Sequence, residues 1–306
     1  MNTAAPTKLS LWQVWLLAAR PRTLPAAAAP VLVGCAVAAY EGVFRPLPAL
    51  AAFLVGLLLQ IGANISNDYF DFKKGADTSE RVGPLRVTQA GLLTPRQVIG
   101  GMVVVFGAAA LIGIYLIWVA GLPALVLGVV AILSALAYTG GPYPLAYHGW
   151  GEVFVLLFFG LAAVCGTYFV QAGTLSMAAV WSSLPVGLLA MAILTVNNLR
   201  DIATDRASGK HTLAVRLGER GAVLEYGVWV GLAYGVVLTG VILGVLPLAA
   251  LLSLLSLPLA VRLMKQVART RGRALNPLLA KTGQLELLFA SLYAAGLLFS
   301  RWWSGF

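Results

Sequence analysis

Long apolar runs, joined by short polar or glycine- and proline-rich segments, occupy most of this 306-residue chain. An α-helix of about 20 apolar residues spans the roughly 30 Å hydrocarbon layer of a bilayer. Only 10% of the residues are charged, against about 25% in soluble domains. We therefore expect an all-α integral membrane protein in which about nine transmembrane helices form a single bundle, with one domain over 1–306. The runs place these helices near 24–40, 48–67, 97–118, 121–139, 152–171, 178–199, 221–243, 246–264 and 284–303.

A shorter apolar stretch at 9–19 precedes the first run. It contains Trp12 and Trp15 and is followed directly by Arg20. Aromatic anchors beside a basic residue are typical of a helix that lies at the membrane surface, and not of a cleavable signal peptide. We expect an interfacial helix there.

The basic residues are distributed unevenly between the two sides of the predicted bundle. Three polar loops are expected, at about 68–96, 200–220 and 265–283. If these loops and the N-terminus share one side, 19 of the 21 Lys and Arg residues lie on that side, and only Arg45 and Arg301 lie on the other. Positive charge marks the cytoplasmic side of membrane proteins. The net charge of +10 is therefore explained by the orientation of the protein in the membrane. Lipid is its expected surrounding, and no nucleic-acid partner is expected.

All five aspartates of the chain lie in two short segments, each at the predicted cytoplasmic end of a span. In a helix, residues four apart share a face, so each segment presents a polar, acidic face. Ionisable groups at membrane depth are costly and are functional by default. Oxygen ligands suit Mg²⁺, which completes its shell with water and substrate phosphates. The candidate metal ligands are Asn67, Asp68, Asp71 and Asp77 in the first segment, and Asn197, Asp201 and Asp205 in the second.

Basic residues follow both acidic segments, and the nearest are Lys74, Arg86 and Lys210. Carboxylate-bound Mg²⁺ interleaved with Lys and Arg can hold a diphosphate. The plainer interpretation is that the aspartates cap helix ends and that the bases only orient the protein in the membrane. The two clusters recur about 130 residues apart, which indicates a weak repeat across four spans. A further segment from Tyr138 to His148 is either an aromatic wall of the site or an ordinary interfacial turn.

These motifs resemble those of the UbiA superfamily of intramembrane prenyltransferases. The first motif reads Asn67-Asp-Tyr-Phe-Asp-Phe-Lys-Lys-Gly and the second reads Asn197-Asn-Leu-Arg-Asp. The connecting phrases resemble the branch of the family that prenylates 1,4-dihydroxy-2-naphthoate in menaquinone synthesis. These phrases are Ala19-Arg-Pro-Arg-Thr-Leu-Pro, Gly83-Pro-Leu-Arg-Val-Thr-Gln-Ala-Gly and Tyr138-Thr-Gly-Gly-Pro-Tyr-Pro. The resemblance extends over about 18–220. The chain departs from the wider family at Gly75, where a third aspartate is common, and at Pro142, where some relatives have lysine.

The resemblance implies a helical bundle with an active-site cavity at its cytoplasmic end, in a bacterial cytoplasmic (inner) membrane. It implies Mg²⁺-dependent transfer of a polyprenyl group from polyprenyl diphosphate to the naphthoate, with loss of CO₂ and diphosphate to give demethylmenaquinol. Asp68, Asp71, Asp201 and Asp205 would be catalytic, and the metal ligands and bases named above would bind the diphosphate. The residues expected to contact the acceptor or to shield the cation are Asn64, Tyr138, Arg20 and Arg200.

Two other functions fit parts of the pattern. One is prenyl transfer to another aromatic acceptor, such as 4-hydroxybenzoate, homogentisate or a porphyrin. The other is transport of a divalent cation, which inverted repeats and acids at the membrane midplane would favour. Here the acids lie at one predicted face, and the clusters recur after an even number of spans, so the two repeats run parallel. The pattern favours the prenyltransferase.

Overall fold

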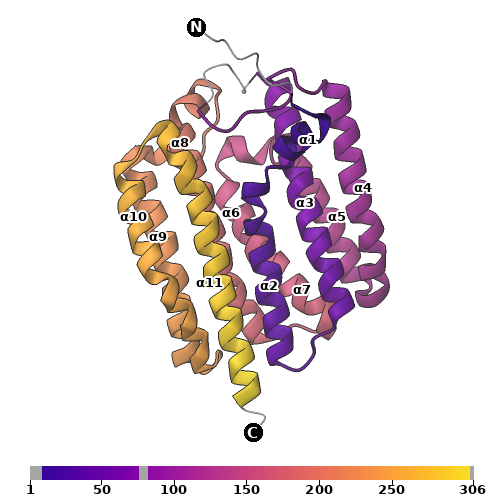
Figure 1. Ribbon diagram of the computed structural model, residues 1–306, viewed down its shortest axis with the longest axis vertical. Helices are drawn as coiled ribbons and strands as arrows, with labels where there is room; N and C mark the ends of the chain where they lie inside the picture. The colour runs from indigo at the N-terminus through magenta and orange to yellow at the C-terminus, as the bar shows by residue number, and fades with distance from the viewer. Residues whose placement is uncertain (1–8, 76–81, 304–306) are drawn as a thin grey trace.

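The computed structural model describes residues 9–75 and 82–303, and these form helices and turns with no strand among them. Most of the helices run along the long axis of the molecule (Figure 1). The α-helices are α1 Leu11–Ala19, α2 Pro25–Tyr40, α3 Pro46–Lys73, α4 Pro95–Ala120, α5 Leu122–Ala137, α6 Gly151–Val155, α7 Ala163–Ala172, α8 Met177–Ala207, α9 Leu213–Ile242, α10 Leu257–Arg269 and α11 Asn276–Trp303. A π-helical segment, Leu156–Ala162, joins α6 to α7. The 3₁₀ segments are Pro21–Thr23, Leu145–His148, Leu248–Ser256 and Gly272–Leu275.

Every predicted span coincides with helical structure in the described residues, and the predicted count of nine spans can be compared with the lengths of these helices. Within the described residues, seven helical segments are long and apolar enough to cross a membrane. An eighth is possible if α1 and α2, which meet at a bend of 53°, count as one broken span. Helix α5 is apolar but has 16 residues, fewer than the roughly 20 that a perpendicular span needs. The chain is a multi-pass membrane protein.

Both acidic motifs are helical, as their four-residue spacing predicted. Helix α3 continues past the expected span end to Lys73, and α8 continues to Ala207. The loops predicted at 68–96 and 200–220 are correspondingly shorter, because continuing each helix satisfies backbone groups that a loop would leave to water. Each helix then ends before a left-handed glycine, Gly75 (φ 68°) after α3 and Gly209 (φ 73°) after α8. Such φ values favour glycine at a helix C-terminus.

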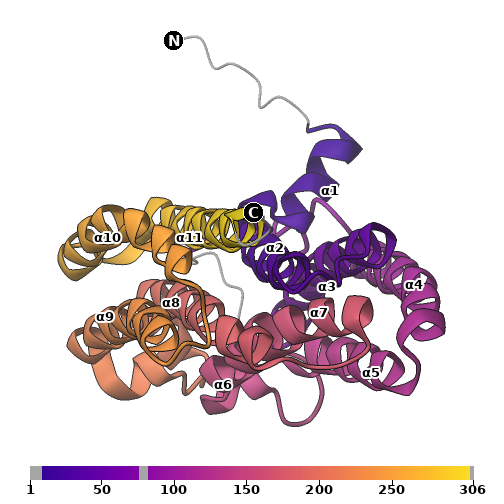
Figure 2. The ribbon, with the colours of Figure 1, turned by 90° about the horizontal axis from the view of Figure 1, so that it is seen from below.

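Seen along the long axis, α9 lies on the opposite side of the bundle from α3 (Figure 2). Helix α8 packs against α9 and α11, and α11 also packs along α2. Small residues permit the closest crossings: a Cβ on Gly160 would lie 3.0 Å from the Cα of Gly187, and a Cβ on Gly296 would lie 2.0 Å from the Ala249 carbonyl oxygen. Close approach at small residues is how helices pack within lipid, where apolar surface alone gives no driving force.

Helix α1 lies against the outside of the bundle. It buries Val14 and Ala18, whereas Trp12 is 74% exposed. The ring of Trp15 covers Gly101 on α4, where an added Cβ would lie 2.5 Å from the indole. An outward apolar and aromatic face is typical of helices that lie at a membrane surface, and the interfacial position of α1 stays a prediction.

Candidate active site

A cavity of about 950 Å³ opens between α2, α3, α4, α5, α7 and α8. Its body is apolar, with walls that include Leu59 of α3, Ile114 of α4 and Phe158 of the π-helical segment. Its polar end is formed by the motif ends of α3 and α8. The sequence-predicted site residues on its wall are Arg20, Asn64, Asn67, Asp71, Arg86, Tyr138, Asn197, Arg200, Asp201, Asp205 and Lys210.

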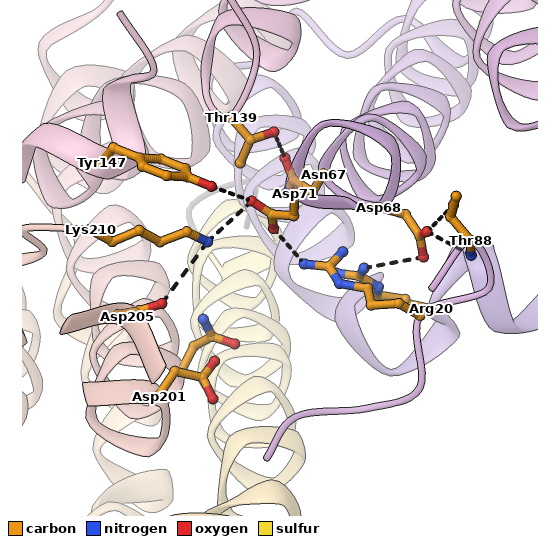
Figure 3. A network of polar contacts seen from close by, with 12 residues as sticks. Arg20, Asn67, Asp68, Asp71, Thr88, Thr139, Tyr147, Asp201, Asp205 and Lys210 are labelled. Atoms are coloured by element: carbon orange, nitrogen blue, oxygen red, sulfur yellow. Dashed lines mark hydrogen bonds and ion pairs between the residues drawn. The ribbon is translucent and has the colours of Figure 1, made fainter. Parts of the chain in front are cut away.

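Asp71 is the centre of the polar end, and it is 2% exposed. Its Oδ2 accepts a hydrogen bond from Arg86 Nη2 at 2.9 Å. Its Oδ1 accepts from Lys210 Nζ and from Tyr147 Oη, each at 3.1 Å. Figure 3 shows the last two contacts arriving from the same side of the carboxylate. A buried carboxylate at the C-terminal end of a helix is doubly unfavourable, and the two cations offset that cost.

Asp68 lies one helical turn from this centre but faces away from the cavity. Its two oxygens accept from the backbone N–H groups of Val87 and Thr88, both at 3.0 Å, and from the Thr88 hydroxyl. Arg20 Nη2 lies 4.0 Å from the same carboxylate. Asp68 is not on the wall of the large cavity. Its contacts anchor the loop that carries Arg86.

Asn67, in contrast, faces the cavity. Its Oδ1 accepts a hydrogen bond from the Thr139 hydroxyl at 2.9 Å. Thr139 follows α5, so this bond ties the first motif to the segment that carries Tyr138 and Tyr147. Figure 3 shows Thr139 meeting Asn67 beside Asp71.

The second motif is organised by Arg200, whose side chain is 2% exposed. Its Nε and Nη2 donate to the two oxygens of Asp201 at 2.8 and 2.5 Å. Nη2 also donates to Asn197 Oδ1 at 2.7 Å, and Nη1 donates to Asn276 Oδ1 at 2.9 Å. This fork geometry is the strong, directional form of an arginine–carboxylate pair. Arg200 lines the cavity, but its donors are engaged in holding Asp201 and Asn197.

Lys210 connects the two motifs. The turn after α8 returns the chain so that the Lys210 N–H donates to the Asp205 backbone oxygen at 2.8 Å. The Lys210 ammonium then lies 3.1 Å from Asp71 and 4.0 Å from Asp205 Oδ1. One lysine therefore neutralises carboxylates from both halves of the chain.

Lys74 and Lys210 lie against the same aromatic ring. Their Nζ atoms are 4.8 and 4.7 Å from the centroid of Tyr147, within cation–π range. Lys74 also donates to the Thr139 carbonyl at 2.8 Å. Desolvation lowers the pKa of Lys74; Asp71 opposes this shift and the charge of Lys210 adds to it. Lys74 is not on the wall of the large cavity. Its contacts with Tyr147 and Thr139 hold residues of the polar end in place from outside the cavity.

Asn64 on α3 binds the turn between α1 and α2 that carries Arg20. Asn64 Nδ2 donates to the Ala19 carbonyl and to the Thr23 hydroxyl at 3.0 and 2.9 Å. Arg20 has a left-handed backbone, with φ 51°, which is uncommon for a residue with a side chain. Asn64 thus fixes the turn that places Arg20 at the cavity. Asp77, the remaining predicted ligand, lies outside the described residues.

Sequence reasoning missed several residues that build the site. Tyr147 was covered only by the broad aromatic segment, and nothing in its spacing marked it as the partner of Asp71. Thr88 and Thr139 lie within the connecting phrases that carry the family resemblance, but no role was predicted for either residue. Asn276 begins α11, distant in sequence from both motifs, and its side chain donates to the Val82 carbonyl at 3.1 Å while accepting from Arg200. Pairings of this kind depend on the tertiary fold.

The donor set can be compared with what Mg²⁺ requires. Across the described chain, no group of three or more His, Cys, Asp or Glu side chains is close enough to form a metal site by itself. Magnesium is commonly bound by one or two carboxylates and completed by substrate phosphates and water. Asp71 on one wall, with Asp201 and Asp205 on the other, supplies such oxygens on both sides of the polar end. The residues fit a metal that is held jointly with a phosphorylated substrate.

Comparisons with known proteins agree with this geometry. The sequence model of the UbiA prenyltransferase family matches residues 27–292. The chain is 38% identical over 305 residues to the 1,4-dihydroxy-2-naphthoate octaprenyltransferase of Escherichia coli (strain K12), covering 96% of this chain and 98% of the relative. The protein of the same name from Mycobacterium tuberculosis (strain ATCC 25618 / H37Rv) is 39% identical over 289 residues, covering 94% and 97%.

A solved structure supports the fold. A UbiA homologue from Archaeoglobus fulgidus, bound to GPP and Mg²⁺, aligns with a TM-score of 0.66 at 13% identity, covering 94% of this chain and 99% of that chain. At that level of identity the likeness concerns the fold alone.

Proposed function

Because the chain belongs to the UbiA prenyltransferase family, we propose that it transfers a polyprenyl group from polyprenyl diphosphate to 1,4-dihydroxy-2-naphthoate, releasing CO₂ and diphosphate. The product is demethylmenaquinol. The observation that carries this proposal is the junction of the two motifs at Asp71, Lys210 and Asp205, at the polar end of an otherwise apolar cavity. Acids and bases from two helices meet where a diphosphate head would lie above an isoprenyl tail.

The proposed metal is Mg²⁺, held by Asn67, Asp71, Asn197, Asp201 and Asp205 together with the diphosphate. When bound, it neutralises negative charge that develops on the leaving diphosphate. The A. fulgidus homologue was solved with GPP and Mg²⁺, which supports the choice of metal, whereas the ligands are proposed from the cavity wall of this chain. Asp68 is proposed to act from behind this set by anchoring the loop of Arg86.

The diphosphate contacts on the protein are assigned to Arg86 and Lys210. Both bind Asp71 in this structure, and a bound diphosphate would compete for their N–H donors. Cationic donors at the point where charge develops stabilise a transition state. The C–O bond breaks with its electron pair remaining on the diphosphate oxygen, which leaves an allylic cation in the prenyl group.

The acceptor ring then supplies the electrons for the new C–C bond. Attack from the ring carbon that bears the carboxylate lets the C–CO₂ bond electrons restore aromaticity as CO₂ leaves. Water would quench the cation, and the apolar walls formed by residues such as Leu59, Ile114 and Phe158 would exclude it. Tyr138, on the cavity wall, and Arg20 are proposed to face the acceptor or the cation.

The membrane orientation completes the proposal. The described parts of the three basic loops and the helix α1 lie near one end of the bundle, because Arg200 contacts Asn276, Lys210 contacts Asp71 and Asn64 contacts Ala19. Positive charge favours the cytoplasmic side. We assign the polar end to the cytoplasm and the protein to a bacterial cytoplasmic membrane, where both substrates would be available.

The test is an assay of the purified full-length chain in lipid vesicles with polyprenyl diphosphate, Mg²⁺ and carboxyl-labelled naphthoate. We expect labelled CO₂ release that Asp71→Ala and Asp201→Ala each lower by at least about 100-fold, the magnitude typical of lost electrostatic stabilisation. Prenylation of 4-hydroxybenzoate in place of the naphthoate would change the acceptor. No transfer to any aromatic acceptor would reject the enzyme, and Mg²⁺ flux through the vesicles would then support a transporter.

A further inference from the structure

Glu152 is a buried acid that the proposed reaction does not use. It lies in the first turn of α6 and is 5% exposed. Its Oε1 accepts a hydrogen bond from Asn198 Nδ2 at 3.1 Å. It is not on the wall of the large cavity, although Asn198 is. Burying a carboxylate is costly, and Asn198 is the side-chain hydrogen-bond partner of Glu152 within the described residues, so this acid invites a functional explanation.

A second, water-sized cavity of about 20 Å³ lies beside Glu152. Its wall includes Tyr138, Asn198 and Thr212, which also line the large cavity, so a polar partition separates the two spaces. Gly151 allows this arrangement: a Cβ there would lie 3.1 Å from the Tyr138 hydroxyl. The partition is therefore built closely around Tyr138 and Asn198.

The bond to Glu152 determines how the Asn198 amide is oriented. A carboxylate oxygen only accepts, so it selects the NH₂ group and leaves the amide oxygen turned away. Within the described chain, neither Asn198 Oδ1 nor Tyr138 Oη has a protein hydrogen-bond partner, and neither is fully enclosed. The partition thus offers an amide oxygen that accepts and a phenol that can donate or accept.

Asn198 lies at a height in the cavity where a neutral polar side chain would be next to the reacting carbon of the acceptor. Asn198 follows Asn197 and precedes Asp201 by three residues on α8, so it lies just below the proposed diphosphate site. Leu194, one turn deeper, also lines the large cavity. An aromatic ring at this height would have its edge near Asn198 and Tyr138.

We propose that Glu152 is a positioning residue that holds the Asn198 amide so that its oxygen accepts a hydrogen bond from a ring hydroxyl of the aromatic acceptor. Asn198 is then the specificity contact, with Tyr138 beside it. This inference rests on the proposed function, because it requires a hydroxylated aromatic acceptor in the cavity. It adds the contact that distinguishes a dihydroxylated ring from one that lacks the hydroxyl.

The experiment measures the two substrates separately. The KM for the naphthoate, the KM for polyprenyl diphosphate and the inhibition constants of 1-hydroxy-2-naphthoate and 4-hydroxy-2-naphthoate are determined for the wild-type chain and its variants. Each analogue lacks one of the two ring hydroxyls of the naphthoate. In the wild type, the analogue that lacks the hydroxyl bound by Asn198 should have an inhibition constant about tenfold higher than the analogue that keeps it, since the amide oxygen of Asn198 would be left without a donor.

Asn198→Leu should raise the naphthoate KM about tenfold and reduce the difference between the analogues to less than about twofold, with the polyprenyl diphosphate KM changed by less than twofold. Glu152→Gln should reduce the same difference partially, because a glutamine can bind either face of the Asn198 amide. Glu286→Gln is the matched control: Glu286 is a fully buried acid on α11 that lines neither cavity. It should leave both KM values and the analogue difference unchanged.

Equal increases in both KM values, or an analogue difference that survives in Asn198→Leu, would overturn the inference. If that variant does not fold, the analogue difference in Glu152→Gln decides alone, and an unchanged difference overturns the role of Glu152. An active wild-type enzyme with unaltered discrimination in the variants rejects only this inference. A wild-type chain that releases no CO₂ from the naphthoate rejects the proposed function and, with it, the premise of this one.

Discussion

Lys210 Nζ lies 3.1 Å from Asp71 Oδ1, although 139 residues separate the two in the chain. The pair joins the end of α3 to the turn after α8, so the two halves of the sequence share one charged centre. Burying such a pair costs free energy, and removing one partner strongly destabilises the protein because the other charge is left buried and unpaired. The cost is understandable if the same cation must later be available to a diphosphate.

Lys210→Met should therefore raise the KM for polyprenyl diphosphate by about 10- to 100-fold, the cost of a hydrogen bond to a charged group. Lys74→Met is the matched comparison, because Lys74 contacts the same Tyr147 ring but donates to the Thr139 carbonyl behind the cavity. It should change that KM by less than about threefold. Steady-state kinetics with varied diphosphate measures both. Equal effects of the two substitutions would contradict the assignment of Lys210.

Asp68→Ala should act mainly on stability. The substitution leaves the N–H groups of Val87 and Thr88 without the acceptor that they have at 3.0 Å. We expect the free energy of unfolding to fall by about 2–4 kcal/mol, and the diphosphate KM to rise because the loop of Arg86 is released. Denaturation in mixed micelles gives the first quantity. Full stability together with loss of Mg²⁺ affinity would instead make Asp68 a metal ligand.

Removal of divalent metal should abolish transfer without unfolding the chain. The carboxylates of the site are already paired with protein cations, as Asp71 is with Arg86 and Asp201 is with Arg200. The apo fold therefore needs no metal to neutralise them. After treatment with EDTA, CO₂ release should fall to background and return with Mg²⁺, while the melting temperature changes by less than about 3 °C. Persistent activity after exhaustive chelation would exclude a metal role.

Gly128→Leu should shorten the prenyl tail that the enzyme accepts. Gly128 lies on the cavity wall, and a Cβ added there meets no atom within 4 Å, so the larger side chain would occupy tail space. We expect kcat/KM for a long polyprenyl diphosphate to fall about tenfold, with little change for geranyl diphosphate. Gly231→Leu is the control, since Gly231 also has open space but does not line the cavity. Identical losses for both tail lengths would argue against a tail channel beside Gly128.

The sequence predicted much of the architecture for a simple physical reason. Apolar runs near the thickness of a bilayer and four-residue acidic spacings are local signals, and both depend on helical geometry alone. These signals predicted α3 and α8, and they identified four residues that line the cavity in the structure: Asn67, Asp71, Asn197 and Asp201. The same reasoning predicted a span at 121–139, and the helix found there, α5, has 16 residues, because composition alone does not fix where a helix ends.

The sequence does not show which polar side chains contact each other after folding, and these contacts determine the role of each site residue. Asp68 and Asp71 are three residues apart and look equivalent in the motif, yet one binds a loop backbone and the other faces the cavity. Arg200 was expected at the acceptor, but its donors are occupied by Asp201, Asn197 and Asn276. These assignments depend on the path of loops that carry no periodic pattern.

The contact of Asn276 with both Arg200 and the Val82 carbonyl has a consequence for how such chains can be divided. Helix α11 carries neither aspartate motif, yet its first residue holds the arginine of the second motif and the loop that follows the first. A chain cut before Asn276 would keep every motif residue and lose the two hydrogen bonds by which Asn276 joins Arg200 to the loop after the first motif. Fragments identified by motif alone would therefore be inactive, and activity should return only when the missing helix is supplied in trans.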